Sequence, residues 1–240
     1  MRDLPPPLPP RERTIGQLIA EAIRAYGNRF WRVLPLGLPL AIVDQACAGQ
    51  PLGAQVLIYW AAAPLFVAAF VQGCVIVYDA SWKWTAFGVG LLIYAVFPPL
   101  RAAYLIPGLA WFAFIGLAVP AALVERRRFR DALVRGRELG TADYFHALGS
   151  LAALVIGVGV AEYALEFLLR SQSDSGLRVA VFLADLVLSP LLYLGGALLY
   201  EDQVARVGSP RHQRRRRRHA DLHPPLDADT AGRPDPEGHS

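Results

Sequence analysis

The sequence predicts an all-α, polytopic membrane protein with six transmembrane helices, two interfacial amphipathic helices and disordered termini. Its composition is the first reason: 54% of the residues are hydrophobic and 18% are charged, whereas soluble domains are about 45–50% apolar and about 25% charged. The second reason is the spacing of charge. Residues 33–78 hold one formal charge, Asp44, and residues 84–124 hold one, Arg101. Each run has the length of two spans of roughly 20 residues joined by a turn.

Turn residues divide these runs into spans. We expect Gly49-Gln50-Pro51 to break the first run and Pro98-Pro99 with Arg101 to break the second, and the polar loop 171–176 separates two further spans. The expected spans lie near 33–49, 53–78, 84–100, 102–124, 147–169 and 179–200. They belong to a membrane domain over 14–205. Before it, 1–13 is expected to be a disordered Pro-rich leader without the apolar region of a secretory signal; after it, 206–240 is expected to be a disordered Arg-rich tail.

The basic residues predict the orientation. With six spans, 21 of the 24 Lys and Arg residues lie on one side, and only Arg101, Arg170 and Arg178 lie on the other. Short loops on the cytoplasmic side of a membrane accumulate Lys and Arg. We therefore expect a multi-pass protein of the plasma (inner) membrane with both termini in the cytoplasm.

Two segments have helical periodicity without being spans. Over 14–31 the apolar residues recur at i, i+3, i+4 and i+7 from Ile15, and Thr14-x-x-Gln17 predicts a capping box at the start. Over 126–140 a similar stripe from Phe129 to Leu139 opposes several charges. Each segment carries Arg and leads into a span, which favours a helix in the inner interface; the alternative is a soluble helix that packs on some other domain.

Short blocks in this membrane domain match a known pattern. They are Ile15-Gly16-Gln17-Leu18-Ile19-Ala20-Glu21-Ala22, Tyr26-Gly27-Asn28-Arg29-Phe30-Trp31, Ala118-Val119-Pro120, Glu125-Arg126-Arg127 and Asp131-Ala132-Leu133. On these blocks the chain resembles, over about 14–205, the integral membrane domain family associated with bacterial glycerophosphodiester phosphodiesterases. Gly136 stands where that family often has Ser. The resemblance implies a free-standing membrane domain without the hydrolase, so it assigns no catalytic residue.

The sequence predicts no catalytic, cofactor-binding or metal-binding residue. It contains no Ser-His-Asp set, no H-E-x-x-H motif and no phosphate-binding glycine loop. Cys47 and Cys74 fall inside apolar runs, without the C-x-x-C spacing of a metal or redox site. We therefore expect a protein that is not an enzyme and has no cofactor.

Intramembrane charges are the first candidate site. Asp44, Glu162, Glu166 and Asp185 are expected in the outer half of the bilayer, with Arg101, Arg170 and Arg178 at the outer rim. Because a charge inside a bilayer is costly, such groups normally face the bundle interior and have partners. We expect Glu162 and Asp185 to lie at similar depth on adjacent spans. They either tie helices together or bind a cation, a proton or a lipid head group; side chains reaching to the rim are a third interpretation.

Basic and small residues indicate the partners. The arginines expected to contact anionic phospholipid are Arg126, Arg127, Arg128, Arg130, Arg211, Arg214, Arg215, Arg216, Arg217 and Arg218. Clusters of four to eight basic residues beside a span attract anionic lipid, although they also set topology without binding. Nucleic acid is not an expected partner, because aromatic residues are not interleaved with the arginines. A stripe at Gly149, Ala153, Gly157 and Ala161 predicts close helix packing, within the chain, in a homodimer or with another membrane protein.

Two functions are consistent with this pattern. The first is a non-enzymatic protein that organises or senses the cell envelope and binds anionic lipid through its basic inner face. The alternative is a small transporter or permease subunit whose outer acidic residues bind a cation or an amphiphile. A transporter needs polar groups leading to both faces, and the sequence places intramembrane charge in the outer half alone, which favours the first function.

Overall fold

A computed structural model describes residues 13–103, 105–169 and 174–208, and every regular element in these ranges is a helix. In chain order the helices are α1 (Ile15–Asn28), α2 (Phe30–Val33), the 3₁₀ helix η2 (Leu34–Gly37), α3 (Leu38–Cys47), α4 (Leu52–Ala61), α5 (Ala63–Tyr78), α6 (Trp84–Ala103), α7 (Leu105–Ile115), α8 (Ala118–Val124), α9 (Phe129–Ala142), α10 (Tyr144–Leu169), α11 (Asp174–Leu188) and α12 (Pro190–Val207). The predicted all-α class is confirmed for the described residues.

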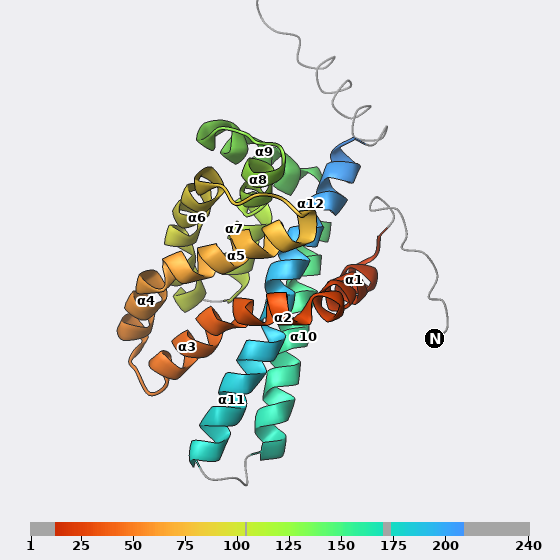
Figure 1. Cartoon of the computed structure of the whole chain (residues 1–240). Helices are drawn as coiled ribbons and strands as arrows, with labels where there is room; N and C mark the ends of the chain where they lie inside the picture. Colours follow the sequence, from red (N-terminus) through yellow and green to blue (C-terminus); the bar gives the residue numbers. More distant parts are fainter. Residues whose placement is uncertain (1–12, 104, 170–173, 209–240) are drawn as a thin grey trace, which may run out of the picture.

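Three helical stretches are long and apolar enough to cross a membrane: Ile106–Val124, Tyr144–Leu169 and Gly176–Val207. A fourth is reached if the pair Leu52–Ala61 and Ala63–Tyr78, bent by 52°, forms one span. The described part of the chain therefore has three, or up to four, helices that are long and apolar enough to cross a membrane. In Figure 1, α10 and α11 run side by side beyond the other helices, and α8 and α9 lie toward the opposite end.

Prolines shorten the first two expected spans. The expected span 33–49 is divided into the end of α2, η2 and α3, with a proline in the first turn of both η2 and α3. The expected span 53–78 bends at Ala62, and Pro64 occupies the first turn of α5. Because proline has no N–H to donate to the carbonyl four residues earlier, a continuous helix loses a hydrogen bond at each of these points.

The break expected at Pro98-Pro99 with Arg101 falls slightly later, because α6 continues through both prolines to Ala103 and α7 begins at Leu105. Pro99 leaves the carbonyl of Ala95 without its usual helical donor. The indole Nε1 of Trp60 donates to that carbonyl at 2.8 Å, and the Nε1 of Trp111 donates to the carbonyl of Ile93 at 3.0 Å. Trp60 thus supplies the donor that Pro99 lacks, as neighbouring helices do for prolines in a span.

The two amphipathic helices form as predicted, with slightly different ends. In α1 the capping box is confirmed: the Gln17 backbone N–H donates to the Thr14 hydroxyl, and the Thr14 N–H donates to the Gln17 side chain. The apolar face of α1 packs on α10 and α12, and that of α9 packs on α7 and α8. Leu18, Ala22 and Leu139 are fully buried. Protein therefore covers the buried part of each apolar face, whereas Ile23 and Phe129 stay exposed. The placement of both helices relative to a membrane stays a prediction.

Glycines allow the closest helix contacts. A Cβ added at Gly136 would lie 2.6 Å from the backbone nitrogen of Ala118, and one at Gly140 would lie 2.7 Å from the carbonyl oxygen of Ala113. In the predicted small-residue stripe, Gly149 contacts Ile15, but Gly157 has no neighbour within 4 Å of such a Cβ. Packing within the chain accordingly accounts for the start of the stripe and not for Gly157.

Candidate functional site

A buried cluster of charges joins the start of α1 to the end of α12. Arg13 is 5% exposed, and its guanidinium donates to Asp202 at 2.8 Å and pairs with Glu21 at 2.7 Å. Asp202 is fully buried and Glu201 lies 3.9 Å from the same guanidinium. Because a buried charge is costly unless it is paired, this arrangement fixes the Arg13 side chain against α12.

The cluster continues to the junction between α9 and α10. Asp143, whose carboxylate accepts from the His146 backbone N–H at 3.3 Å, caps the first turn of α10. The same carboxylate pairs with Arg206 at 2.7 Å, and Arg206 also lies 3.1 Å from the His146 ring nitrogen Nε2. The Nε2 of His146 is 3.8 Å from Asp202. Three segments that are distant in the sequence therefore meet in one polar cluster.

Sequence reasoning missed this cluster and set the terminal boundaries incorrectly. We assigned Arg13 to the leader and Arg206 to the tail, but both are part of the folded protein, and α12 continues to Val207. The available signal was the polar run Glu201-Asp202-Gln203 after an apolar span. Asp202 and Gln203 are both fully buried, which is unusual for polar residues unless they are paired.

A second polar cluster holds the loop between α8 and α9. Glu125 accepts from Arg135 at 3.0 Å, from Arg127 at 2.5 Å and from the hydroxyl of Tyr200 at 2.8 Å. Arg135 also pairs with Glu138 at 2.9 Å. Burial opposes ionisation of Glu125, but the hydrogen bonds from these donors outweigh it and hold the pKa of that carboxyl below its usual value. The cluster ties the loop to α9 and α12.

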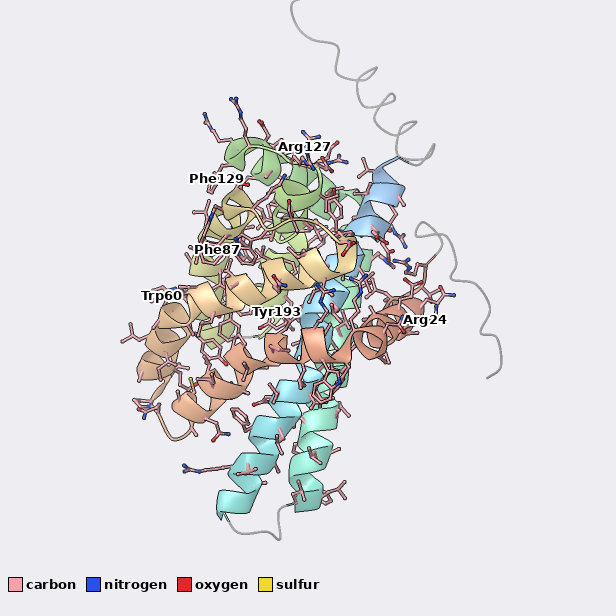
Figure 2. The ribbon with its side chains drawn as sticks, viewed as in Figure 1. Arg24, Trp60, Phe87, Arg127, Phe129 and Tyr193 are labelled. Carbon is pink, nitrogen blue, oxygen red and sulfur yellow. The ribbon has the colours of Figure 1, made fainter. Side chains whose placement is uncertain are left out.

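The structure places four of the arginines predicted to contact lipid on the surface. Arg126, Arg127, Arg128 and Arg130 are exposed, and Arg126 has a positive φ of 55° at the turn into α9. Figure 2 shows Arg127 and Phe129 at the same end of the molecule, and Phe129 is itself 39% exposed. The predicted tail arginines Arg211, Arg214, Arg215, Arg216, Arg217 and Arg218 lie outside the described residues.

The predicted outer acidic residues divide into two places. Glu162 on α10 and Asp185 on α11 line one narrow hollow, together with Ala180, Val181 and Ala184, so the prediction that these two carboxylates are neighbours on adjacent helices is confirmed. Asp44 does not line this hollow; it accepts a hydrogen bond from the Tyr59 hydroxyl at 2.9 Å.

Of the three arginines predicted to pair with these acids, the structure describes the side chain of Arg178. Arg178 is exposed, and its backbone carbonyl accepts from the Gln45 side chain at 3.2 Å. Arg170 and the side chains of Arg101 and Glu166 lie outside the described residues.

Within the described ranges, no group of three or more His, Cys, Asp or Glu residues is placed to hold a metal ion. No family model, curated protein or solved structure matches the chain. The three to four helices that are long and apolar enough to cross a membrane indicate a membrane protein.

Proposed function

We propose that this chain is a non-enzymatic integral membrane protein that organises or senses the cell envelope and binds anionic phospholipid through its inner face. One observation carries the proposal: exposed arginines at Arg126–Arg130 lie beside exposed apolar side chains. Each basic residue near an anionic surface contributes about 1 kcal/mol of attraction. We also propose that the chain belongs to the membrane domain family that its sequence resembles.

The loop between α8 and α9 is suited to such a surface because it is held in place. Glu125 anchors Arg127 and Arg135, so the neighbouring Arg126, Arg128 and Arg130 are presented by a fixed turn. Such preorganisation lowers the entropy lost on binding. In a lipid surface the guanidinium groups would meet phosphates, which they bind through paired hydrogen bonds.

Large exposed aromatic residues support a position at the membrane interface. Trp31 is 81% exposed, Trp84 is 77% exposed and Phe145 is 85% exposed. Trp in particular is enriched at the boundary between lipid and water. Each of the three lies next to a segment predicted to be cytoplasmic, as a ring of interfacial anchors requires.

We further propose the six-span topology, with both termini in the cytoplasm. Reporter fusions at Gln50, Arg101 and Ser173 are expected to report the outer side, and fusions at Lys83 and Arg128 the inner side. Ser173 lies outside the described residues. A reversal at any one of these sites would contradict the topology.

Lipid binding is tested by retention of phospholipid on the purified protein. We expect native mass spectrometry to show retained phosphatidylglycerol or cardiolipin after extraction from mixed vesicles that also contain phosphatidylcholine. Replacing Arg126, Arg128 and Arg130 with Gln should reduce this retention at least several-fold. Arg178→Gln is the matched control, because it removes an exposed arginine from the end predicted to face outward. Equal retention by the triple variant and wild type would contradict the proposal.

The transporter alternative is favoured by one observation, a cavity beside Asp44 of about 260 Å³. Reconstituted vesicles would show uptake of an organic cation that depends on Asp44 if this second function holds. Uptake equal to that of protein-free vesicles would remove it.

A further inference from the structure

A cavity where α3 meets α4 contains Asp44, the single formal charge of residues 33–78. Asp44, Gln55 and Tyr59 form its polar side, and Leu52 and Val56 are among its apolar residues. Its volume of about 260 Å³ lies below the roughly 300–1,000 Å³ of pockets for drug-sized ligands. It is nevertheless large enough for several waters or a small polar group.

Asp44 is the carboxylate that this cavity presents to a ligand. Tyr59 donates its hydroxyl hydrogen to Asp44 at 2.9 Å, which uses one of the roughly four acceptor positions of a carboxylate. Among the side chains that the structure describes, no Lys, Arg or His lies within ion-pair distance of Asp44. A carboxylate beside apolar walls is stabilised by a cation that enters from outside.

Stacked aromatic rings hold the Tyr59 hydroxyl in place. The ring of Tyr59 stacks on Phe66 with centroids 5.7 Å apart, and Phe66 stacks on Tyr94 at 5.4 Å. Tyr59 is itself only 6% exposed. Because the ring is fixed in this stack, the hydroxyl and the carboxylate that it orients form a rigid side of the cavity, as a binding site requires.

The polar groups of the cavity select the kind of cation. Asp44 accepts from the Tyr59 hydroxyl, and an ionised carboxylate can only accept hydrogen bonds. Gln55 donates its side-chain N–H to the carbonyl of Gln50 at 2.9 Å, which leaves its amide oxygen as an acceptor. A site made of acceptors around a carboxylate is complementary to a group with several N–H donors, and a primary ammonium has three.

We propose that the cavity lined by Asp44, Gln55 and Tyr59 binds a primary organic ammonium group. The group is either a free small amine or the ethanolamine head of a phospholipid, which share this chemistry. Binding here is independent of the proposed lipid site at Arg126–Arg130, because the two use different residues and opposite charges. It also requires no transport.

The test uses full-length protein purified in dodecyl maltoside and in phosphate buffer, since amine buffers would compete. Ethanolamine is titrated while the melting temperature is followed, with tetramethylammonium as a probe of equal charge but no N–H group. Ethanolamine should raise the melting temperature of the wild type, and tetramethylammonium should do so at least tenfold less effectively. In parallel, native mass spectrometry should compare retained phosphatidylethanolamine with phosphatidylcholine.

Asp44→Asn is the decisive variant because an amide oxygen can still accept from Tyr59, so the protein should fold. It should weaken ethanolamine binding at least tenfold, or abolish selective retention of phosphatidylethanolamine. Asp79→Asn is the control, since Asp79 is an exposed acid in the turn after α5. A response to soluble ethanolamine identifies a free-amine site, and selective lipid retention alone identifies a head-group site. No response in either arm, equal effects of both probes, or an unchanged Asp44→Asn variant would overturn the proposal.

Discussion

Gly37→Ala should destabilise the protein because at Gly37 the chain meets the backbone of another helix. A Cβ built there would come closest to the carbonyl oxygen of Leu186, and it would lie 2.7 Å from the carbonyl carbon and 2.8 Å from the Cα of that residue. Ordinary contacts begin at 3.4 Å, so η2 and α11 would have to separate by more than roughly 0.7 Å, the difference between 3.4 and the 2.7 Å to the carbonyl carbon. A backbone cannot rotate away as a side chain can. Overpacking of this kind costs about 1–3 kcal/mol.

Gly157→Ala is the matched control for this prediction. Gly157 lies inside α10 with nothing within 4 Å of the added Cβ, so alanine should stabilise the helix by about 0.8–1 kcal/mol through its higher helix propensity. A cost of about 2 kcal/mol at Gly37 corresponds to a melting temperature lowered by about 4–8 °C for a chain of this size.

Thermal unfolding of both variants in one detergent provides the measurement. We expect Gly37→Ala to melt clearly below the wild type and Gly157→Ala to melt at or above it. The reasoning is refuted if Gly37→Ala melts at the wild-type temperature, since that would mean that η2 does not lie against the backbone of α11.

Three further predictions concern the two polar clusters and the hollow between α10 and α11. Asp202→Ala leaves buried Arg13 without its closest partner on α12 and should cost about 3–5 kcal/mol, whereas Asp202→Asn, which can still accept, should cost less; equal melting of the two variants would argue against the pair. Glu125, whose pKa is held down mainly by hydrogen bonds that outweigh burial, should contribute full stability above its unfolded pKa of about 4.3 and lose that contribution as the pH falls through its lower folded pKa. Unfolding measured from pH 7 to pH 3 should therefore show a shallower decline for Glu125→Gln than for the wild type, and parallel curves would contradict this. Glu162→Leu should lower the melting temperature while Glu162→Gln leaves it nearly unchanged, because an amide still hydrogen-bonds in the hollow shared with Asp185; near-native melting of both would remove the structural role of Glu162.

The sequence by itself was sufficient for features that depend on neighbouring residues. The capping box at Thr14 and Gln17 is a contact across three positions, and the amphipathic faces of α1 and α9 follow from a period of 3.6 residues. The proximity of Glu162 and Asp185 followed from one short turn between two apolar helices, since such a turn makes the helices antiparallel neighbours. These features arise within a helix or a hairpin and require no knowledge of the remaining packing.

Only the tertiary structure decided where helices break and which charges meet. The two prolines of α6 would end a helix by local rules, but α6 continues through both, and Trp60, 35 residues away from Ala95, supplies the donor that Pro99 lacks. Arg13 and Asp202 are 189 residues apart, and both lay in or beside segments whose composition resembles a terminus. Gly37 resembles other glycines in the sequence, yet at Gly37 the added Cβ would meet a backbone and at Gly157 it would meet open space. In each case tertiary packing brings the hydrogen-bonding, ion-pairing or clashing partner close. The spacing of residues along the chain does not predict that partner.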